Sequence, residues 1–318
     1  MNKKFNTFSK YLLLTLLSSI IIFGANAKTP VKNNKAGKHA TACDTQCKSA
    51  DTFTLYQLPS VADDHGDSYV IVTKNGKVIA IDGGKVAETN FLRGFLAALG
   101  NHVDAWINTH PHSDHVGAMT NILKNPMGLK IDNIYYSRFT QNLLDLNDGT
   151  EMALKYYAAL DSLNSNGITK VTDCEPGMQF EIDGVNFKIL SKRNPEITTN
   201  VCNNSSMAFR IWDDKKSIVN LGDLGVEGGN KLLNSKYRAD VDCDYLKMPH
   251  HGQSCCDENF FKTINFKACL WPTPSWLWTC IKKNGEKGPW TTLQTRKWIE
   301  DKGITKNYVM ADGMHVIR

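Results

Sequence analysis

Positions 109–117, THPHSDHVG, carry the residue types of a metal site, because three histidines and one aspartate lie within six consecutive positions. His110 and His112 are two residues apart, and alternate side chains of extended backbone point to the same side, so both imidazoles can bind one cation. Asp114 and His115 lie in the turn that follows, where a second cation can bind beside the first. Imidazole and carboxylate ligands suit zinc, with manganese or iron as alternatives.

The flanking sequence indicates how this cluster is held. A strand-like run, 103–108 (VDAWIN), leads into it, and a helix-like run, 116–123, leads out of it. Pro111 fixes its own φ and favours extended backbone at His110. A solvated histidine-rich loop is the alternative, but such a loop has no reason to follow a buried strand or to include an aspartate at this spacing.

Further side chains of the same types lie at the ends of other expected strands. Asp82 follows the strand 78–81, and Asp223 follows the strand VNL and a glycine. His250 and His251 follow the strand YLKM and a proline. Loops at one rim of a sheet can assemble a site on a rigid frame. Five of the nine histidines lie in the two histidine-bearing segments, which strengthens the assignment.

From Thr52 onward, the pattern is one of short strands separated by helices. Asn75 and Gly76 form a hairpin signal between two of these strands. The expected elements are strands 53–58, 68–74 and 77–81, helix 86–99, strand 131–136, helix 151–165, a hairpin of 179–182 with 185–190, strands 206–212, 216–221 and 244–248, helix 290–302, and strands 307–310 and 315–317. Repeated strand pairs broken by helices predict two mixed β-sheets covered by helices on their outer faces.

These residues resemble the metallo-β-lactamase superfamily. The resemblance covers roughly residues 53–318 and consists of an HxHxDH motif, a strand-end aspartate, a metal-bridging aspartate and a late histidine: His110, His112, Asp114 and His115, then Asp82, Asp223 and His250. It implies an α/β (α+β) fold, specifically an αββα sandwich of two mixed β-sheets flanked by helices. It also implies a hydrolytic centre with two divalent metal ions at the sheet edge.

The resemblance implies a role for each side chain. The two metals would be bound by six residues: His110 and His112 for the first, Asp114, His115 and His250 for the second, and Asp223 for both. Two such cations lower the pKa of a shared water and clamp the attacking and leaving oxygens. Asp114 and His251 are the expected catalytic residues, and His251 could protonate the leaving group, with a structural histidine as the alternative. Asp82 would orient the metal ligands without binding a metal itself.

One departure from the family pattern affects the first metal. Many members supply a third histidine before the second aspartate, but this chain has no histidine between His115 and His250. The equivalent stretch, CNNSS at 202–206, looks more like the hydrolase domains of competence-type DNA-uptake proteins and of teichoic-acid phosphorylcholine esterases. Cys202, Asn203 or Asn204 could contribute to the first metal, the two asparagines are also candidate substrate contacts, and the cysteine could instead form a disulfide.

Three tryptophans, Trp271, Trp276 and Trp278, lie close together in the stretch LWPTPSWLW. Such indoles could form an aromatic cage for a quaternary ammonium group such as choline. Packing of the tryptophans in the core or in loops is the alternative. The expected helix 151–165 lies where the superfamily inserts elements that cover the substrate.

The N-terminus predicts export. Lysines precede an apolar run, 11–23, and Ala25-Asn26-Ala27 resembles a cleavage site, so 1–27 is a secretory signal peptide with cleavage after Ala27. An uncleaved anchor is the alternative, although the run is shorter than the roughly 20 residues that span a bilayer. The polar segment 28–51 is a linker, and 52–318 forms one hydrolase domain. We therefore expect a secreted, periplasmic or extracellular protein.

Nine cysteines lie beyond the signal segment, and in an exported chain they favour disulfides over a cysteine-built zinc site. The formal net charge of +5 falls when the signal lysines are removed, which gives little support to nucleic acid binding. A small-molecule or cell-envelope substrate fits better.

Three functions compete. The first is a secreted metal-dependent hydrolase acting on a phosphoester, either a phosphodiester or a phosphorylcholine-type ester, as the resemblance to the asparagine-bearing branch implies. The second keeps the enzyme but changes the bond to that of a lactone or a β-lactam. The third is a non-catalytic envelope binding protein that retains the fold.

Overall fold

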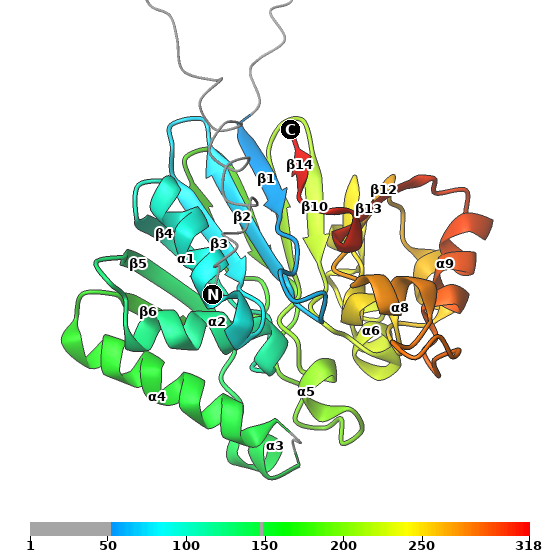
Figure 1. The fold of residues 1–318 in the computed structure, drawn as a ribbon, viewed down its shortest axis with the longest axis horizontal. Helices are drawn as coiled ribbons and strands as arrows, with labels where there is room; N and C mark the ends of the chain where they lie inside the picture. The colour runs from blue at the N-terminus through cyan, green and yellow to red at the C-terminus, as the bar shows by residue number, and fades with distance from the viewer. Residues whose placement is uncertain (1–51, 147–148) are drawn as a thin grey trace, which may run out of the picture. The chain divides into compact units, whose positions relative to one another are not determined.

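Two seven-stranded sheets form the centre of the computed structural model, which describes residues 52–146 and 149–318 (Figure 1). The expected signal peptide, the linker 28–51 and the residues Cys43 and Cys47 lie outside the described residues. In the part of the chain that is described, no helix is both long and apolar enough to cross a membrane.

The first sheet is built almost entirely from the N-terminal half. Its strands, in spatial order, are β14 (His315–Ile317), β1 (Phe53–Gln57), β2 (Ser68–Thr73), β3 (Val78–Asp82), β4 (His102–Ile107), β5 (Lys130–Tyr136) and β6 (Lys170–Asp173). Pairing is antiparallel from β14 to β3 and parallel from β3 to β6. The last strand of the chain therefore returns to the edge of the sheet where the first strand lies.

The second sheet comes from the C-terminal half. Its spatial order is β13 (Lys306–Val309), β12 (Ala268–Trp271), β11 (Tyr245–Lys247), β10 (Ser217–Asn220), β9 (Phe209–Trp212), β8 (Val185–Ile189) and β7 (Gln179–Ile182). The strands β7 to β10 pair antiparallel, and β10 to β13 pair parallel. Each sheet is thus mixed.

Helices cover the outer face of each sheet (Figure 1). Those of the first half are α1 (Thr89–Ala98), α2 (Ser113–Lys124), α3 (Gln141–Leu146) and α4 (Thr150–Asn166). Those of the second half are α5 (Val201–Asn204), α6 (Val226–Leu233), α7 (Glu258–Thr263), α8 (Ser275–Thr279) and α9 (Thr292–Asp301), with the short 3-10 turn η4 (Pro249–Gly252).

Three apolar clusters hold these layers together. One lies between the sheets and joins Ile71 of β2 to Phe187 of β8 and Phe209 of β9. A second joins the first sheet to α1, α2 and α4, and a third joins the second sheet to α6, α7 and α9. Every residue of β3 is buried because both faces of this strand are covered, which explains its continuous apolar sequence. The predicted αββα sandwich is confirmed.

The expected disulfides are not formed among the described cysteines. Seven cysteines are buried as thiols: Cys174, Cys202, Cys243, Cys255, Cys256, Cys269 and Cys280. Burial raises the pKa of Cys174 and Cys243 to about 12, so these two thiols stay protonated. The disulfide prediction is wrong for this part of the chain, because a buried cysteine packs as a small apolar side chain and needs no bridge.

Candidate metal centre

The side chains with metal-binding chemistry lie where strands of both sheets end. Parallel neighbours end at the same edge of a sheet, so β3 and β4 bring Asp82 and the segment 109–115 together. In the second sheet, β10 and β11 are also parallel neighbours, and they lead into Asp223 and into η4. Three candidate ligand groups lie at this edge. Two are described next, and the third is formed by Asp67, Asp82 and His115.

The first group consists of His110, His112 and Cys202, whose ligand atoms all lie within 4.8 Å of one another. The Nε2 atom of His110 is 3.1 Å from the Nδ1 atom of His112. Both His110 and Cys202 are buried, while His112 is half-buried. The short helix α5 therefore brings a thiol to the two imidazoles that sequence spacing had already paired.

The second group consists of Asp114, His115, Asp223 and His251, again within 4.8 Å of one another. The Oδ2 atom of Asp223 is 3.2 Å from the Nε2 atom of His115 and 3.4 Å from that of His251. The Oδ2 atom of Asp114 is 3.1 Å from the same His251 nitrogen. These side chains converge on one point from both sheets.

The imidazole orientations fit metal binding. His110 turns its Nδ1 atom toward the hydroxyls of Thr109 and Ser206, at 3.1 and 3.3 Å, and His251 turns its Nδ1 atom toward the carbonyl of Pro272, at 2.7 Å. These contacts leave each Nε2 atom for the centre, as metal-binding histidines require. The Nε2 atom of His115 is also buried, and it faces the Oδ2 atom of Asp223 at 3.2 Å.

The spacing of the ligand atoms fits zinc as well. Ligands at about 2.0–2.1 Å from a tetrahedral zinc ion lie about 3.3 Å from one another. Four distances between ligand atoms match this value, at 3.1–3.4 Å. They join His110 to His112, His115 to Asp223, and His251 to Asp114 and to Asp223. The residues present therefore fit a pair of divalent ions.

The structure places the two adjacent histidines differently from the sequence-based expectation. His251, expected to act on the substrate, lies in the second ligand group, whereas His250, expected to bind the second metal, does not. The Nε2 atom of His250 is 3.2 Å from the amide nitrogen of Asn203, and its Nδ1 atom is 3.3 Å from the carbonyl of Ser254. Both histidines have left-handed backbone, with φ of 48° and 54°, and this turn directs the two rings to different surroundings.

Asp82 lies directly behind His115. Its carboxylate accepts hydrogen bonds from the backbone N–H and the hydroxyl of Thr109, each at 2.8 Å, and lies 2.9 Å from the Nδ1 atom of His115. This arrangement fixes the ring of His115 with its Nε2 atom toward Asp223.

Two buried charges beside the centre were missed from the sequence. Lys247 of β11 and Asp67, in the loop before β2, are both fully buried and form an ion pair. The lysine Nζ also lies 3.3 Å from the Oδ1 atom of Asp223 and donates to the carbonyl of Gly222 at 2.8 Å. A lysine inside an otherwise apolar strand is the one signal that the sequence offered.

The charges of the ligands suit metal binding. Burial by itself would raise the pKa of Asp223, but the positive charges of His115 and Lys247 hold it well below the usual value. Burial would also raise the pKa of Asp114, and the hydrogen bond from His251 holds it low. Burial and the charge of His115 keep the pKa of His110 well below its usual value. Ionised carboxylates and the neutral imidazole of His110 are the forms that bind cations. Although burial lowers the pKa of His115 and of His251, the charge of Asp223 raises both, so a bound cation would have to displace a proton from each of these rings.

The two asparagines of the CNNSS stretch differ in their surroundings. The Oδ1 atom of Asn204 accepts from the backbone N–H groups of Gly225 and Gly228, at 3.1 and 3.0 Å, so this side chain holds the start of α6. Asn203 donates to Asn200 at 2.9 Å and lies beside His250.

The three tryptophans do not form one cage. Trp271 is buried in β12 and donates to Asn307 at 2.8 Å, because the strand directs it into the core. Trp278 packs edge-on against Trp271 and beneath the guanidinium of Arg296. Only Trp276 of the three faces a hollow, which it lines together with Trp290, whose ring centroid is 4.6 Å away.

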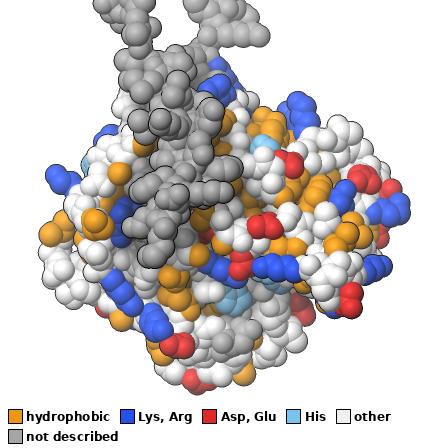
Figure 2. All heavy atoms as spheres, in the orientation of Figure 1, with side chains coloured by type: hydrophobic (Ala, Val, Ile, Leu, Met, Phe, Trp, Pro, Cys, Tyr) orange, Lys and Arg blue, Asp and Glu red, His pale blue; other side chains and the backbone are white. Residues whose placement is uncertain are grey.

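An open cleft lies over the ligands. It has a volume of about 450 Å³ and is lined by His65, Lys85, His112, Ser113, Asp114, Gly149, Glu151 and Met152. Figure 2 shows histidine side chains at the surface next to lysine, arginine and acidic side chains. The ring of His65 lies between those of His251 and Trp276, each 4.8 Å away. Sequence reasoning missed His65 because it lies outside both histidine motifs.

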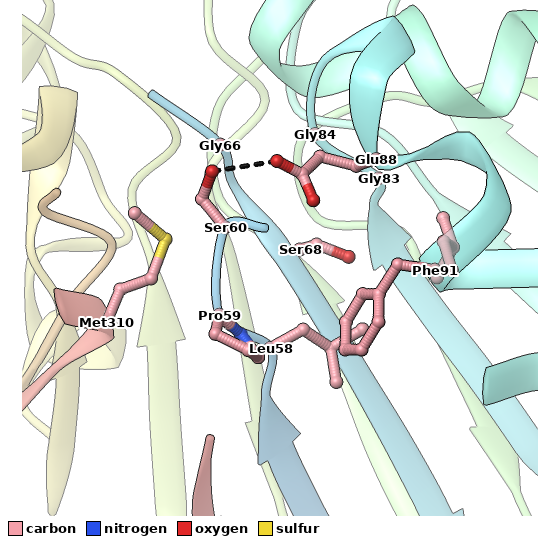
Figure 3. A pocket seen from close by; sticks show the side chains of 11 residues that line it. Leu58, Pro59, Ser60, Gly66, Ser68, Gly83, Gly84, Glu88, Phe91 and Met310 are labelled. Atoms are coloured by element: carbon pink, nitrogen blue, oxygen red, sulfur yellow. Dashed lines mark hydrogen bonds between the residues drawn. The ribbon is translucent and has the colours of Figure 1, made fainter. Parts of the chain in front are cut away.

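The loop that carries His65 is anchored through Glu88 (Figure 3). The carboxylate of Glu88 accepts from the hydroxyl of Ser60 at 2.7 Å and from the backbone N–H of Val61 at 3.0 Å. Gly84 has φ of +79°, and a Cβ there would lie 2.9 Å from Glu88 Cγ. A glycine at this position therefore lets the loop after β3 pack closely against Glu88.

The comparisons with known proteins agree with this geometry. Residues 61–127 match the family model described as the metallo-beta-lactamase superfamily, and the search of curated proteins found no match. The structure resembles the metallo-beta-lactamase fold protein YhfI from Bacillus subtilis, at 14% identity and TM-score 0.50, over 84% of this chain and 100% of that one. It also resembles unliganded yeast PDE1, at 12% identity and TM-score 0.51, over 81% and 96% of the two chains.

A third similar structure is CmlA, a diiron β-hydroxylase from Streptomyces venezuelae, at 11% identity and TM-score 0.50, over 85% of this chain and 55% of that one. Together these findings confirm the metallo-β-lactamase fold and the resemblance to that superfamily.

Proposed function

We propose that this protein is a metal-dependent hydrolase that cleaves a phosphoester, either a phosphodiester or a phosphorylcholine-type ester. The observation that carries the proposal is the pair of adjacent ligand groups beneath an open cleft, with ligand distances of 3.1–3.4 Å. When bound, two divalent ions lower the pKa of a shared water and stabilise the oxygens that attack and leave.

The protein's own residues hold and orient this centre. Asp82 and Thr109 fix His115, and Lys247 holds Asp223 in its charged form. His65 lies at the cleft next to His251, with its Nε2 atom buried and without a hydrogen-bond partner. Burial lowers the pKa of His65 to about 4, so the ring beside the cleft is neutral.

Two observations favour phosphoesters over other bonds. Lys85 lines the cleft and supplies a cation for a phosphate group, although it also pairs with Asp64 at 2.7 Å. Among the similar structures, yeast PDE1 is a phosphodiesterase. The fold alone does not set the reaction, since CmlA has the same fold and is a β-hydroxylase.

The test is hydrolysis by the zinc-loaded full chain. We expect turnover of bis-p-nitrophenyl phosphate or p-nitrophenylphosphorylcholine, and none of nitrocefin or of simple lactones. Asp223→Asn should lower activity by more than about 100-fold, beyond the loss seen when only an outer contact is removed. Asp161→Asn, on the exposed surface of α4, should keep full activity.

Turnover of lactones or nitrocefin with phosphoesters untouched would assign a different bond to the same centre. Tight binding of two metals without turnover of any of these compounds would favour a binding protein.

We also propose that the protein is exported, on the evidence of the charged and apolar segment 1–23 and the Ala25-Asn26-Ala27 site. N-terminal sequencing of protein recovered from outside the cytoplasm should begin at Lys28. A chain that keeps Met1 would contradict cleavage.

A further inference from the structure

We propose that Cys202 is the third protein ligand of the first metal, as a thiolate in place of the third histidine that this chain lacks. The inference rests on the proposed metal centre but goes beyond it, because it assigns a mixed ligand set of two imidazoles and one sulfur. Such a set binds zinc well and differs chemically from an all-imidazole site.

The position of the thiol carries the inference. The Sγ atom of Cys202 lies within 4.8 Å of the ligand nitrogens of His110 and His112, and the side chain is 2% exposed. A zinc ion would hold sulfur at about 2.3 Å and nitrogen at about 2.0 Å. A thiol buried against two converging imidazoles can therefore reach the same ion with little movement.

The helix that carries the thiol is fixed independently of any metal. The backbone carbonyl of Asn204 accepts from the side chain of Asn194 at 2.6 Å, and its own side chain binds the start of α6. These bonds tie α5 to the segment that follows Asp223. Cys202 is thus presented by the same framework that positions the ligands of the second metal.

The neighbouring side chain is a poorer candidate. The Nδ2 atom of Asn203 is 2.9 Å from Asn200 and 3.2 Å from His250, and its Oδ1 atom is buried without a hydrogen-bond partner, so Asn203 competes only as a neutral amide oxygen. A thiolate is also the stronger ligand, since an amide oxygen carries no charge. On binding, the Sγ–H bond breaks, one proton leaves to solvent, and a sulfur–metal bond forms.

The test is cobalt substitution of the full chain, read by absorption and by metal content. We expect a thiolate-to-cobalt charge-transfer band in the near ultraviolet and two ions per chain. The Cys202→Ala variant should lose the band. It should also bind the first ion at least about 10-fold more weakly, because removing even an outer contact of a metal site typically lowers metal affinity by this factor. The matched control is Cys174→Ala, a buried cysteine that belongs to none of the ligand groups, and it should keep both.

A second measurement needs no variant and remains informative if Cys202→Ala does not fold. X-ray absorption at the zinc edge of the wild-type chain should show one sulfur neighbour at about 2.3 Å for two zinc ions. A shell of nitrogen and oxygen alone, or a charge-transfer band that persists in folded Cys202→Ala, would overturn the proposal. Neither result would bear on phosphoester hydrolysis, which is measured separately.

Discussion

His250 and His251 are adjacent in the chain but lie in different environments. Left-handed backbone at both positions directs one ring to Asn203 and Ser254 and the other to the carboxylates of Asp114 and Asp223. The sequence suggested the opposite assignment because the resemblance to the metallo-β-lactamase superfamily placed its late histidine at His250.

This assignment gives a prediction for two matched variants. Asparagine tolerates left-handed backbone, so His250→Asn and His251→Asn should fold alike. We expect His251→Asn to bind its second metal more than about 10-fold more weakly, because a ligand is lost, and His250→Asn to bind two metals normally. Titration with zinc, followed by metal analysis after gel filtration, measures both. The opposite ranking would restore the order inferred from the sequence.

At the residue scale, contacts between residues close in the sequence could be predicted, whereas contacts between distant residues could not. The two-residue separation of His110 and His112 was enough to bring their nitrogens within 3.1 Å. Asp67 and Lys247 could not be paired from the sequence, because the contact joins residues from opposite halves of the chain.

Turns between elements place the ligands as much as the strands do. Gly252 closes η4 with φ of +81°, and a Cβ there would lie 2.4 Å from Cζ3 of the buried Trp271. The residue that follows His251 therefore has to be small, and its backbone has to be left-handed. This close packing fixes the end of the turn that carries His251.

The variants Gly252→Ala and Gly285→Ala test the need for a small residue separately from the need for left-handed backbone. Gly285 has a similar φ of +84° with nothing near its Cβ position, so its substitution should cost only the backbone strain, about 1–2 kcal/mol of unfolding free energy. Gly252→Ala should cost about 1–3 kcal/mol more, because Trp271 has to move. It should also weaken metal binding. Urea unfolding and zinc titration measure the difference, and equal losses would argue against the contact.

At the scale of elements, hairpins and long helices were well predicted. Asp183 and Gly184 both have positive φ, as the two-residue turn requires, and α4 extends only one residue beyond each end of its expected range. The four-residue helix α5 was missed, because a single turn is too short to show helical periodicity. That helix carries Cys202.

For the whole molecule, the metal centre couples two sheets. The segment after β4 of the first sheet supplies His110, His112, Asp114 and His115. Segments between strands of the second sheet supply Cys202, Asp223 and His251. A ligand that binds only the native state raises the free energy of unfolding by about 2.7 kcal/mol when its free concentration is 100 times the dissociation constant.

We therefore expect chelation to lower the unfolding temperature of the full chain by several degrees. The comparison is thermal unfolding in zinc and after dialysis against a chelator. Asp223→Asn serves as the control, because it should bind less metal and respond less. An identical unfolding temperature with and without zinc would show that the native state does not depend on metal.

The topology of the whole molecule was only partly accessible from the sequence. Strand pairs and helices predicted two covered sheets, but the return of β14 to pair with β1 depends on a contact between the two ends of the domain. No local pattern records such a pairing.

The division of the chain between the sheets has a practical consequence. A polypeptide cut between β6 and β7 would yield an N-terminal fragment with four of the seven candidate ligands of the two metals and a first sheet that lacks β14. The C-terminal fragment would hold the other three ligands, the second sheet and β14. Zinc would then act as a cross-link that favours reassembly of the severed pieces, so fragment complementation in bacteria could report the availability of the ion.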